Sequence, residues 1–339
     1  MRIVKRLDFS PGLDFMQNLT PATIDAYLTD RGIVAQRTTL LAGGVSGNVF
    51  RVETSEGRFV VKQACPQLRT RDAWFSDVDR IFREVDVLNV LADVLPESTT
   101  PRVLWVDRAN FAFAMTHAPD GPGTWKDLLL AGSVEVACAA QAGRVLGRIH
   151  ADSSRHAERY AAFDDGTVFR QLRVDPFYRT VAQRCPDVAD KIEPLIRDLL
   201  ERRVALCHGD FTPKNMLVHA QGFTLVDFET ATFGEPAFDI GLFLAHLVLK
   251  AIHQPRCRGA FYEAIAAFRA AYRLEIPAAD IEDREARGLR HLGACLLART
   301  DGTSPATYLT ATDQNAARSL ARVLLSGGCF EDLCRVDDQ

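Results

Sequence analysis

Hydrophobic and polar positions change their spacing about a third of the way along the chain. Residues 34–64 follow the two-residue period of antiparallel strands, and a Ser-Glu-Gly turn at 55–57 indicates a tight hairpin. Two more apolar segments, 102–107 and 111–117, have strand composition and are joined by a short polar turn. Residues 74–95 repeat their apolar positions at three- and four-residue steps, which predicts a helix. The pattern therefore predicts a small antiparallel sheet with one helix.

Helical signals stand on both sides of this sheet. A threonine N-cap, a first-turn proline and a closing glycine predict a helical extension at residues 20–32. From about residue 120 helical segments predominate, and Ser133 is the expected N-cap of a long amphipathic helix. We therefore expect an α+β protein with an N-terminal lobe at residues 1–117 and a larger, mainly helical C-terminal lobe at residues 118–339.

Composition is that of an ordinary globular protein. Of the 339 residues 47% are hydrophobic and 25% are charged, and a formal net charge of −4 gives no reason to expect nucleic acid or an anionic membrane as a partner. The N-terminus lacks the apolar segment of a secretory signal, and the longest apolar run, residues 240–249, suits a buried helix better than a membrane span. The eight cysteines form no C-x-x-C pair, so we expect reduced thiols and a cytoplasmic location.

A glycine-rich connection between two expected strands is the first candidate for binding chemistry. Glycines let a backbone approach a ligand closely and present N–H groups to phosphate oxygens. The same composition is typical of a plain hairpin turn, and the absence of a following helix or Gly-Lys-Ser/Thr excludes a Rossmann or Walker loop. The candidate nucleotide-binding residues of this loop are Gly43, Gly44, Val45, Ser46 and Gly47.

Two charged residues stand where the pattern predicts burial. Lys62 interrupts an apolar strand, and Glu84 lies among the apolar positions of the expected helix. Taken singly, such a lysine is more typical of a sheet edge, where it extends to water. An ion pair between Lys62 and Glu84, with the ammonium also contacting nucleotide phosphate, would explain both residues because a buried charge needs a partner.

The segment HGDFTPKNML, residues 208–217, carries the strongest chemical signal. Phosphoryl transfer needs a carboxylate that orients the attacking hydroxyl and accepts its proton, and Asp210 can supply it. The reaction also needs oxygen ligands for Mg²⁺, and Asn215 and Asp227 can supply these. A capped turn is the alternative interpretation of this segment. It does not account for the ordered set of glycine loop, Lys62, catalytic loop and Asp227, which follows the kinase pattern with HGD for HRD and DFE for DFG.

The chain resembles the aminoglycoside phosphotransferase and choline-kinase-like group of small-molecule kinases. The resemblance runs from about residue 37 to 310 and rests on HGDFTPKNMLV, LVDFETATFGEPAFDIG, the LGRIHA helix end and the VVK strand. It implies a bilobal protein-kinase-like fold with ATP and Mg²⁺ as cofactors, and it implies that ATP binds between the lobes. It further implies that Met115 and His117 lie near adenine, and that His208 and Asp239 support the catalytic loop.

Three departures from the family pattern concern the site. The D-x-E spacing of Asp227 and Glu229 resembles that of methylthioribose kinases, so Glu229 is either a metal-supporting residue or a solvated charge. Lys214 stands where antibiotic kinases have a small residue, and it could neutralise a phosphate or lie at the loop surface. Arg299 and Asp301 end a long helix in a segment that resembles other bacterial members; they are candidate substrate contacts, although charges there usually serve only as caps.

These observations predict an ATP- and Mg²⁺-dependent enzyme that phosphorylates a hydroxyl group of a small molecule. A nucleotide-binding pseudokinase with a regulatory role is the alternative. Protein kinase activity is disfavoured because no A-P-E element follows Asp227. The acceptor stays open among aminoglycoside, sugar, thiosugar, amino alcohol and nucleoside, and the oligomeric state is not indicated by the sequence.

Overall fold

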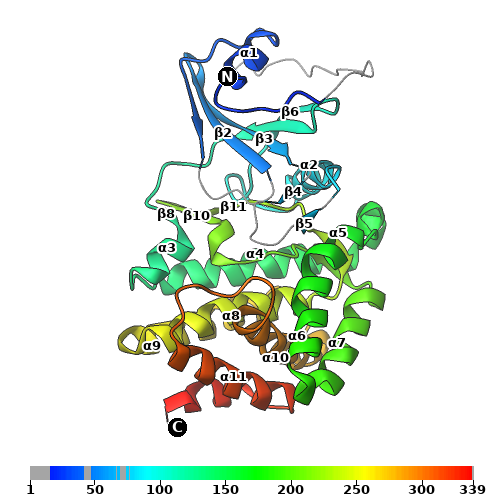
Figure 1. Cartoon of the computed structure of the whole chain (residues 1–339), viewed down its shortest axis with the longest axis vertical. Coiled ribbons are helices and arrows are strands. Elements are labelled where there is room, and N and C mark those ends of the chain that lie inside the picture. The colour runs from blue at the N-terminus through cyan, green and yellow to red at the C-terminus, as the bar shows by residue number, and fades with distance from the viewer. Residues whose placement is uncertain (1–15, 42–46, 66, 69–73, 76, 338–339) are drawn as a thin grey trace. The chain divides into compact units, whose positions relative to one another are not determined.

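The computed structural model describes residues 16–41, 47–65, 67–68, 74–75 and 77–337. The chain divides into two compact units, residues 1–119 and 120–339, and the boundary expected from the sequence stands two residues earlier, after residue 117. Figure 1 shows the elements in chain order. Each unit has its own core, and we describe each separately.

The N-terminal unit is built around an antiparallel sheet. Its elements are α1 (Ile24–Thr29), β1 (Arg37–Leu40), β2 (Gly47–Thr54), β3 (Gly57–Ala64), β4 (Gln67–Leu68), β5 (Trp74–Phe75), α2 (Arg80–Leu91), β6 (Val103–Asp107) and β7 (Ala112–Thr116). Five strands form the main sheet in the order β1-β2-β3-β7-β6. The sheet and the helix after β3 agree with the sequence prediction.

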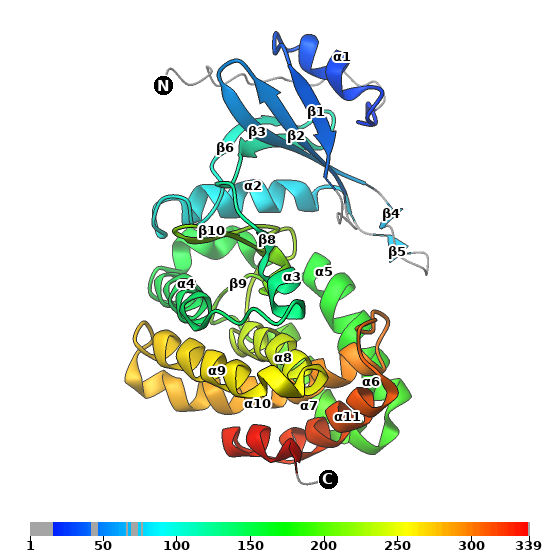
Figure 2. The ribbon, with the colours of Figure 1, turned by 90° about the vertical axis from the view of Figure 1, so that its left-hand side faces the viewer.

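Strand alternation sorts the side chains of this sheet to two faces. Val61 of β3 is fully buried in a core with Phe50, Val52 and the apolar residues of α1. The next residue, Lys62, points to the opposite face, because successive side chains of a strand alternate. Figure 2 shows α1 and α2 on opposite sides of the sheet. The sheet therefore separates a mainly apolar core from a face that carries a buried lysine.

Two helices of this unit are shorter than the sequence pattern predicts. The expected helix at residues 74–95 begins only at Arg80, because Trp74 and Phe75 form the short strand β5 and the Asp77 carboxylate accepts the backbone N–H of Asp79 at 3.0 Å in a local turn. The extension at residues 20–32 is helical only at Ile24–Thr29, and turns precede and follow it.

The C-terminal unit is mainly helical. Its elements are β8 (Gly123–Thr124), α3 (Trp125–Leu130), α4 (Val136–Arg155), η1 (Ala157–Phe163), α5 (Thr167–Phe169), η2 (Arg170–Arg179), α6 (Thr180–Arg184), η3 (Pro186–Val188), α7 (Ala189–Glu201), β9 (Ala205–Cys207), η4 (Pro213–Asn215), β10 (Met216–His219), β11 (Gly222–Leu225), β12 (Thr232–Gly234), α8 (Ala237–His253), η5 (Pro255–Cys257), α9 (Arg258–Arg273), α10 (Ala278–Thr300), α11 (Ala311–Leu325) and η6 (Phe330–Asp337).

Four long helices form the centre of this unit. Helix α4 packs along α9, and α8 packs against α9 and α10 (Figures 1 and 2). Almost every residue of α8 is buried, as expected for its apolar run. Among the described residues no single helix is long and apolar enough to cross a membrane, although α8 and α9 together meet that test as a pair bent by 115°. Two small ribbons, β10 with β11 and β9 with β12, hold the loops between the helices.

The expected N-cap of the long helix is wrong. Ser133 belongs to the end of α3, where its backbone N–H bonds to Leu128 O and the Gly132 N–H bonds to Leu129 O. Gly132 has a φ of 83°, so these residues form a Schellman motif that ends α3. Helix α4 consequently starts at Val136, after Glu135.

Candidate active site

The buried cation of the N-terminal unit is paired as the sequence predicts. Lys62 Nζ lies 2.6 Å from Glu84 Oε2, and the two side chains are 7% and 1% exposed. Lys62 is held in β3 between Val49 of β2 and Phe113 of β7, while Glu84 belongs to α2. The ion pair therefore fixes α2 to one face of the sheet and gives the buried ammonium group a counter-charge.

The glycine loop lies largely outside the described residues. This applies to Gly43, Gly44, Val45 and Ser46. Gly47, which opens β2, has a separate structural reason to be glycine, because a Cβ there would stand 2.3 Å from the backbone oxygen of Gln63.

The two residues expected near adenine lie at the end of β7. Met115 is a buried residue of this strand and pairs with Val60 and Val103. His117 follows the strand directly and is partly buried. The backbone next to them is held by Thr116, which donates its N–H to Arg102 O and accepts the Arg102 N–H through its hydroxyl, both at 2.9 Å.

The segment between β9 and β10 is held by one buried carboxylate. Asp239, in the first turn of α8, is fully buried and accepts the backbone N–H of His208 at 2.7 Å and that of Gly209 at 3.0 Å. Gly209 has a φ of 74°, and a Cβ on it would stand 2.5 Å from Thr230 O. Only glycine fits this conformation and this contact. Asp239 thus determines the path of the chain directly before Asp210.

His208 links this segment to the strand that precedes Asp227. Its Nδ1 accepts the backbone N–H of Asp210 at 3.1 Å, and its Nε2 lies 3.2 Å from Val226 O. This pattern requires the neutral tautomer with a proton on Nε2. Burial lowers the pKa of His208, which keeps the ring neutral. The ring also packs against Phe228, with centroids 4.4 Å apart.

Asp210 lies between two cations. Its Oδ1 is 3.0 Å from Arg173 Nη2, and its Oδ2 is 2.8 Å from Lys214 Nζ. Burial alone would raise the pKa of Asp210, but Arg173 and Lys214 outweigh it and hold the pKa well below its usual range. Lys214 is half exposed, so it lies at the loop surface and also contacts the carboxylate. Sequence reasoning missed Arg173, one of three arginines in a stretch that becomes the π-helical segment η2.

The residues proposed to bind metal offer only oxygen ligands. Asn215 donates its amide nitrogen to Asp210 O and Asp210 Oδ2, both at 2.9 Å, so its amide oxygen is the atom that a cation would bind. Asp227 follows β11 with a φ of 74°, and Val226 next to it donates its N–H to Asn215 O at 3.0 Å. Glu229 is buried two residues further on. Amide and carboxylate oxygens fit Mg²⁺ better than softer metals.

A buried trio of His150, Cys207 and Asp239 has its potential ligand atoms within 4.8 Å of one another. Hydrogen bonds account for it: His150 Nε2 lies 3.4 Å from Asp239 Oδ2, and His150 Nδ1 lies 2.9 Å from the Tyr272 hydroxyl. Burial lowers the pKa of His150 and raises that of the Cys207 thiol, so both are neutral. We interpret the trio as support for Asp239.

The two candidate substrate residues at the end of α10 differ in their surroundings. The Asp301 carboxylate is bound by the Arg318 guanidinium, with two nitrogens at 2.8 and 2.9 Å. Arg299 donates to the backbone oxygen and hydroxyl of Ser304. Burial lowers the pKa of Arg299, which nevertheless stays cationic because an arginine pKa is so high.

A second buried cation lies on α8. Lys250 is fully buried, and its ammonium donates to His246 O at 3.0 Å. Burial, together with the charges of Arg299 and Lys126, lowers the pKa of Lys250 to about 7. Within the part of the chain that the structure describes, no carboxylate lies within ion-pair distance of this lysine.

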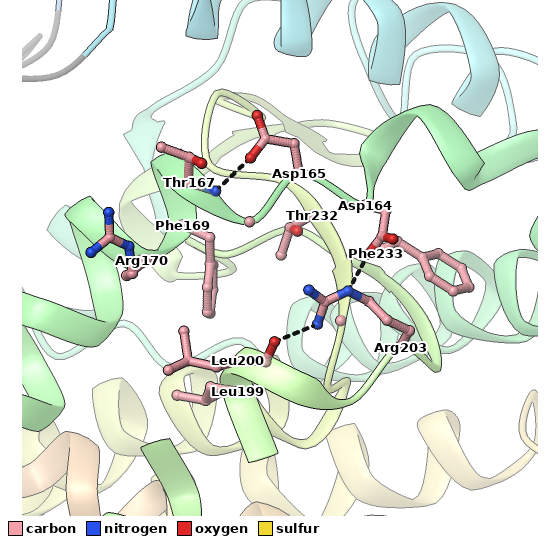
Figure 3. Close-up of a pocket in the computed structure, with 12 residues that line it drawn as sticks. Asp164, Asp165, Thr167, Phe169, Arg170, Leu199, Leu200, Arg203, Thr232 and Phe233 are labelled. Atoms are coloured by element: carbon pink, nitrogen blue, oxygen red, sulfur yellow. Dashed lines mark hydrogen bonds and ion pairs between the residues drawn. The ribbon is translucent and has the colours of Figure 1, made fainter. Parts of the chain in front are cut away.

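A pocket of about 260 Å³ adjoins the β9–β12 ribbon (Figure 3). Its charged lining residues are already paired: Arg203 contacts Asp164, and Asp165 accepts the backbone N–H of Thr167 at 2.9 Å. None of the lining residues is among those predicted for the site.

Comparison with solved structures identifies the fold class. A choline kinase from Cryptosporidium parvum aligns with a TM-score of 0.52 at 12% identity, covering 86% of this chain and 88% of the other. An aminoglycoside phosphotransferase solved with ADP and hygromycin B aligns with a TM-score of 0.51 at 14% identity, covering 91% and 99%. The chain has a protein-kinase-like fold, which confirms the expected α+β class.

The sequence places the chain in a family within that class. Residues 37–274, well over half of the chain, match the phosphotransferase enzyme family, and the chain belongs to it. Methylthioribose kinase from Pectobacterium carotovorum is 28% identical over 66% of this chain, and methylthioribose kinase 1 from Oryza sativa is 24% identical over 59%. The chain spans only 64% and 53% of these two relatives. The resemblance inferred from the motifs is confirmed.

Replacing Asp239 with asparagine should weaken the C-terminal unit. An asparagine turns an amide NH₂ group toward one of the two backbone N–H donors, which leaves that donor buried without an acceptor. We expect Asp239→Asn to lower the free energy of unfolding by on the order of 3 kcal/mol. Urea titration measures this change, with Asp190→Asn at an exposed site of α7 as the control. Equal free energies of unfolding for the two variants would contradict the role of Asp239 in holding the loop.

Replacing Lys250 with methionine should have the opposite effect. The pKa of Lys250 is about 7 in the folded chain and 10.5 in its ordinary state, so folding disfavours the charged form. The loss of folding free energy caused by burying the charged lysine is complete below pH 7 and diminishes as the pH rises toward 10.5. Lys250→Met should therefore raise stability most at or below pH 7, and the gain should shrink as the pH rises. Urea titrations at pH 6.5 and 9.5 measure the free energy of unfolding, with Lys191→Met as the control. A gain in stability that is absent, or that does not depend on pH, would contradict burial of the charge.

Proposed function

We propose that this chain transfers the γ-phosphoryl group of ATP to a hydroxyl group of a small molecule. The observation that carries the proposal is the arrangement around Asp210, a buried carboxylate kept ionised by two cations and bonded to the candidate metal ligand Asn215. A braced loop with these groups suits a reaction in which catalysis consists mainly of positioning and charge stabilisation.

In the proposed reaction the acceptor hydroxyl oxygen attacks the γ-phosphorus, and the bond to the β–γ bridging oxygen breaks. The hydroxyl proton passes to Asp210, and ADP leaves. Because the pKa of Asp210 is low, this carboxylate mainly orients the hydroxyl and takes the proton late. Arg173 and Lys214 lie next to it, where they stabilise negative charge on the transferred group.

Bound Mg²⁺ would be held by Asn215 and Asp227, with Glu229 in support, and would neutralise charge on the phosphate oxygens. Lys62, paired with Glu84, would contact the α- and β-phosphates.

The relatives support a metabolite as the acceptor without specifying which one. Curated relatives are named methylthioribose kinases, while structural neighbours include an aminoglycoside phosphotransferase and a choline kinase. A pseudokinase typically lacks the base or a metal ligand. This chain retains Asp210, Asn215 and Asp227, so a purely regulatory role is not favoured.

Asp210→Asn should abolish transfer while nucleotide binding persists, because the substitution removes the carboxylate that orients the hydroxyl and accepts its proton but leaves Lys62 and Asp227 unchanged. We expect acceptor-stimulated ADP release to fall by about 10²-fold or more. Titration with a fluorescent ATP analogue should give a dissociation constant close to that of the parent chain. Asp190→Asn provides the control for charge. Full ADP release by Asp210→Asn would overturn the proposed chemistry.

A further inference from the structure

One face of α8 carries both the brace of the catalytic loop and a buried cation. Asp239, Phe243, His246 and Lys250 follow one another at steps of three and four residues, which places them on the same side of the helix. Asp239 binds the catalytic loop, and Phe243 packs on Phe211 with ring centroids 5.4 Å apart. The catalytic loop therefore lies against the face of α8 that also presents His246 and Lys250.

The segment after α10 connects this face to the cation beside Asp210. Thr303 donates its backbone N–H and its hydroxyl to Pro176 O, at 3.4 and 3.0 Å, in the same η2 segment that carries Arg173. Further along, the Tyr308 ring lies 5.5 Å from Lys250 Nζ. Arg299 bonds to this segment from the last turn of α10. The segment after α10 thus contacts η2 through Thr303 and α8 through Tyr308, and Arg299 binds it where it leaves α10.

The groups gathered here carry more positive than negative charge. Arg173 and Lys214 share the carboxylate of Asp210. Within the described ranges of the chain, neither Lys250 nor Arg299 lies within ion-pair distance of a carboxylate. An isolated buried cation is destabilising, because it loses its hydration, unless a negative group neutralises it. A negative group is the partner that these two side chains would favour.

Buried polar atoms without a partner lie beside the same two cations. The Nε of Arg299 and the hydroxyl of Tyr308 are both buried and form no hydrogen bond. A buried polar group that stays unpaired destabilises the fold, because it has lost its hydrogen bonds to water. Both are donors, and a guanidinium group favours an oxyanion with several acceptor oxygens. The unpaired Tyr308 hydroxyl adds to the unmatched charges of Lys250 and Arg299, and all three groups favour the same kind of ligand.

A bound nucleotide does not readily account for this region. Lys250 follows Asp239 by eleven residues, which corresponds to about 16 Å along the helix axis. Arg173 and Lys214 already lie at Asp210, where the transferred phosphoryl group would be. Lys250 is therefore better placed for a group of the acceptor away from the reacting hydroxyl, while Arg299 is within reach of the charges of both Lys250 and Asp210.

We propose that the acceptor is a hydroxylated small molecule that bears a carboxylate or a phosphate, and that this anionic group binds Lys250 and Arg299 while the hydroxyl contacts Asp210. This inference rests on the proposed kinase function and specifies its substrate class. A polycation such as an aminoglycoside would meet repulsion at these residues, so they also select against it.

Inorganic phosphate, added without nucleotide, tests the anion site apart from catalysis. We expect phosphate to raise the Tm of the parent chain, of Lys62→Met and of the exposed control Arg197→Met. The shift should fall below half in Lys250→Met and in Arg299→Met, and Lys250→Arg should restore it. No shift in the parent chain, or an undiminished shift in both methionine variants, would overturn the inference whether or not the chain is a kinase.

Pairs of neutral and anionic acceptors test the same site during turnover. They also distinguish a phosphate from a carboxylate as the anionic group. ADP release is measured with ribose against ribose 5-phosphate, with glucose against gluconate, and with kanamycin. We expect kcat/KM at least tenfold higher for an anionic member than for its neutral partner, and Lys250→Met should reduce this preference mainly through KM. A preference for neutral or cationic acceptors overturns the inference and leaves the kinase intact. Transfer to none of them counts against the proposed function, and the phosphate titration still decides the anion site.

Discussion

The candidate site depends on one buried carboxylate. Asp239 accepts two consecutive backbone N–H groups, those of His208 and Gly209, and so determines where the next residue, Asp210, is placed. The arrangement requires glycine at position 209 and a neutral histidine at position 208. It also anchors the catalytic loop to α8, a helix buried along almost its whole length. A short polar segment thereby acquires the rigidity of the helical core.

Buried charge is matched in one unit and unmatched in the other. In the N-terminal unit Lys62 is matched by Glu84, and the pair is complete within the protein. In the C-terminal unit Asp210 meets two cations, while Lys250 and Arg299 have no carboxylate partner within the described residues. A protein tolerates buried cations of this kind where a ligand or a reaction supplies the missing negative charge. The imbalance links the stability of the unit to the chemistry that we propose for it.

Much of this could be predicted from the sequence because the signals were local. Three signals each extend over only a few residues and predict their structure directly. They are the alternating strands around Lys62, the D-x-x-x-x-N spacing and the apolar run of α8. Helix ends were less predictable: Ser133 has the composition of an N-cap but completes the Schellman turn of α3. Competing local hydrogen bonds decide such boundaries, and composition does not distinguish them.

Long-range partners were not predictable for a different reason. Arg173 lies 37 residues before Asp210 in a polar stretch with no helical period, and only the tertiary fold brings the two together. The positions of Lys250 and Tyr308 are likewise set by packing of α8 against the segment after α10. The sequence shows the two-residue spacing of Asp227 and Glu229, but it does not predict that Glu229 is buried. Chemistry that depends on such contacts needs the structure.

Phosphorus NMR of the parent chain with ATP, Mg²⁺ and hydroxylated acceptors tests the central claim most directly, because it follows the transferred group itself. The account predicts that the γ-phosphate signal is lost as ADP forms and that an equal amount of a new phosphomonoester appears. An unchanged ATP spectrum, or conversion only to inorganic phosphate, would contradict it.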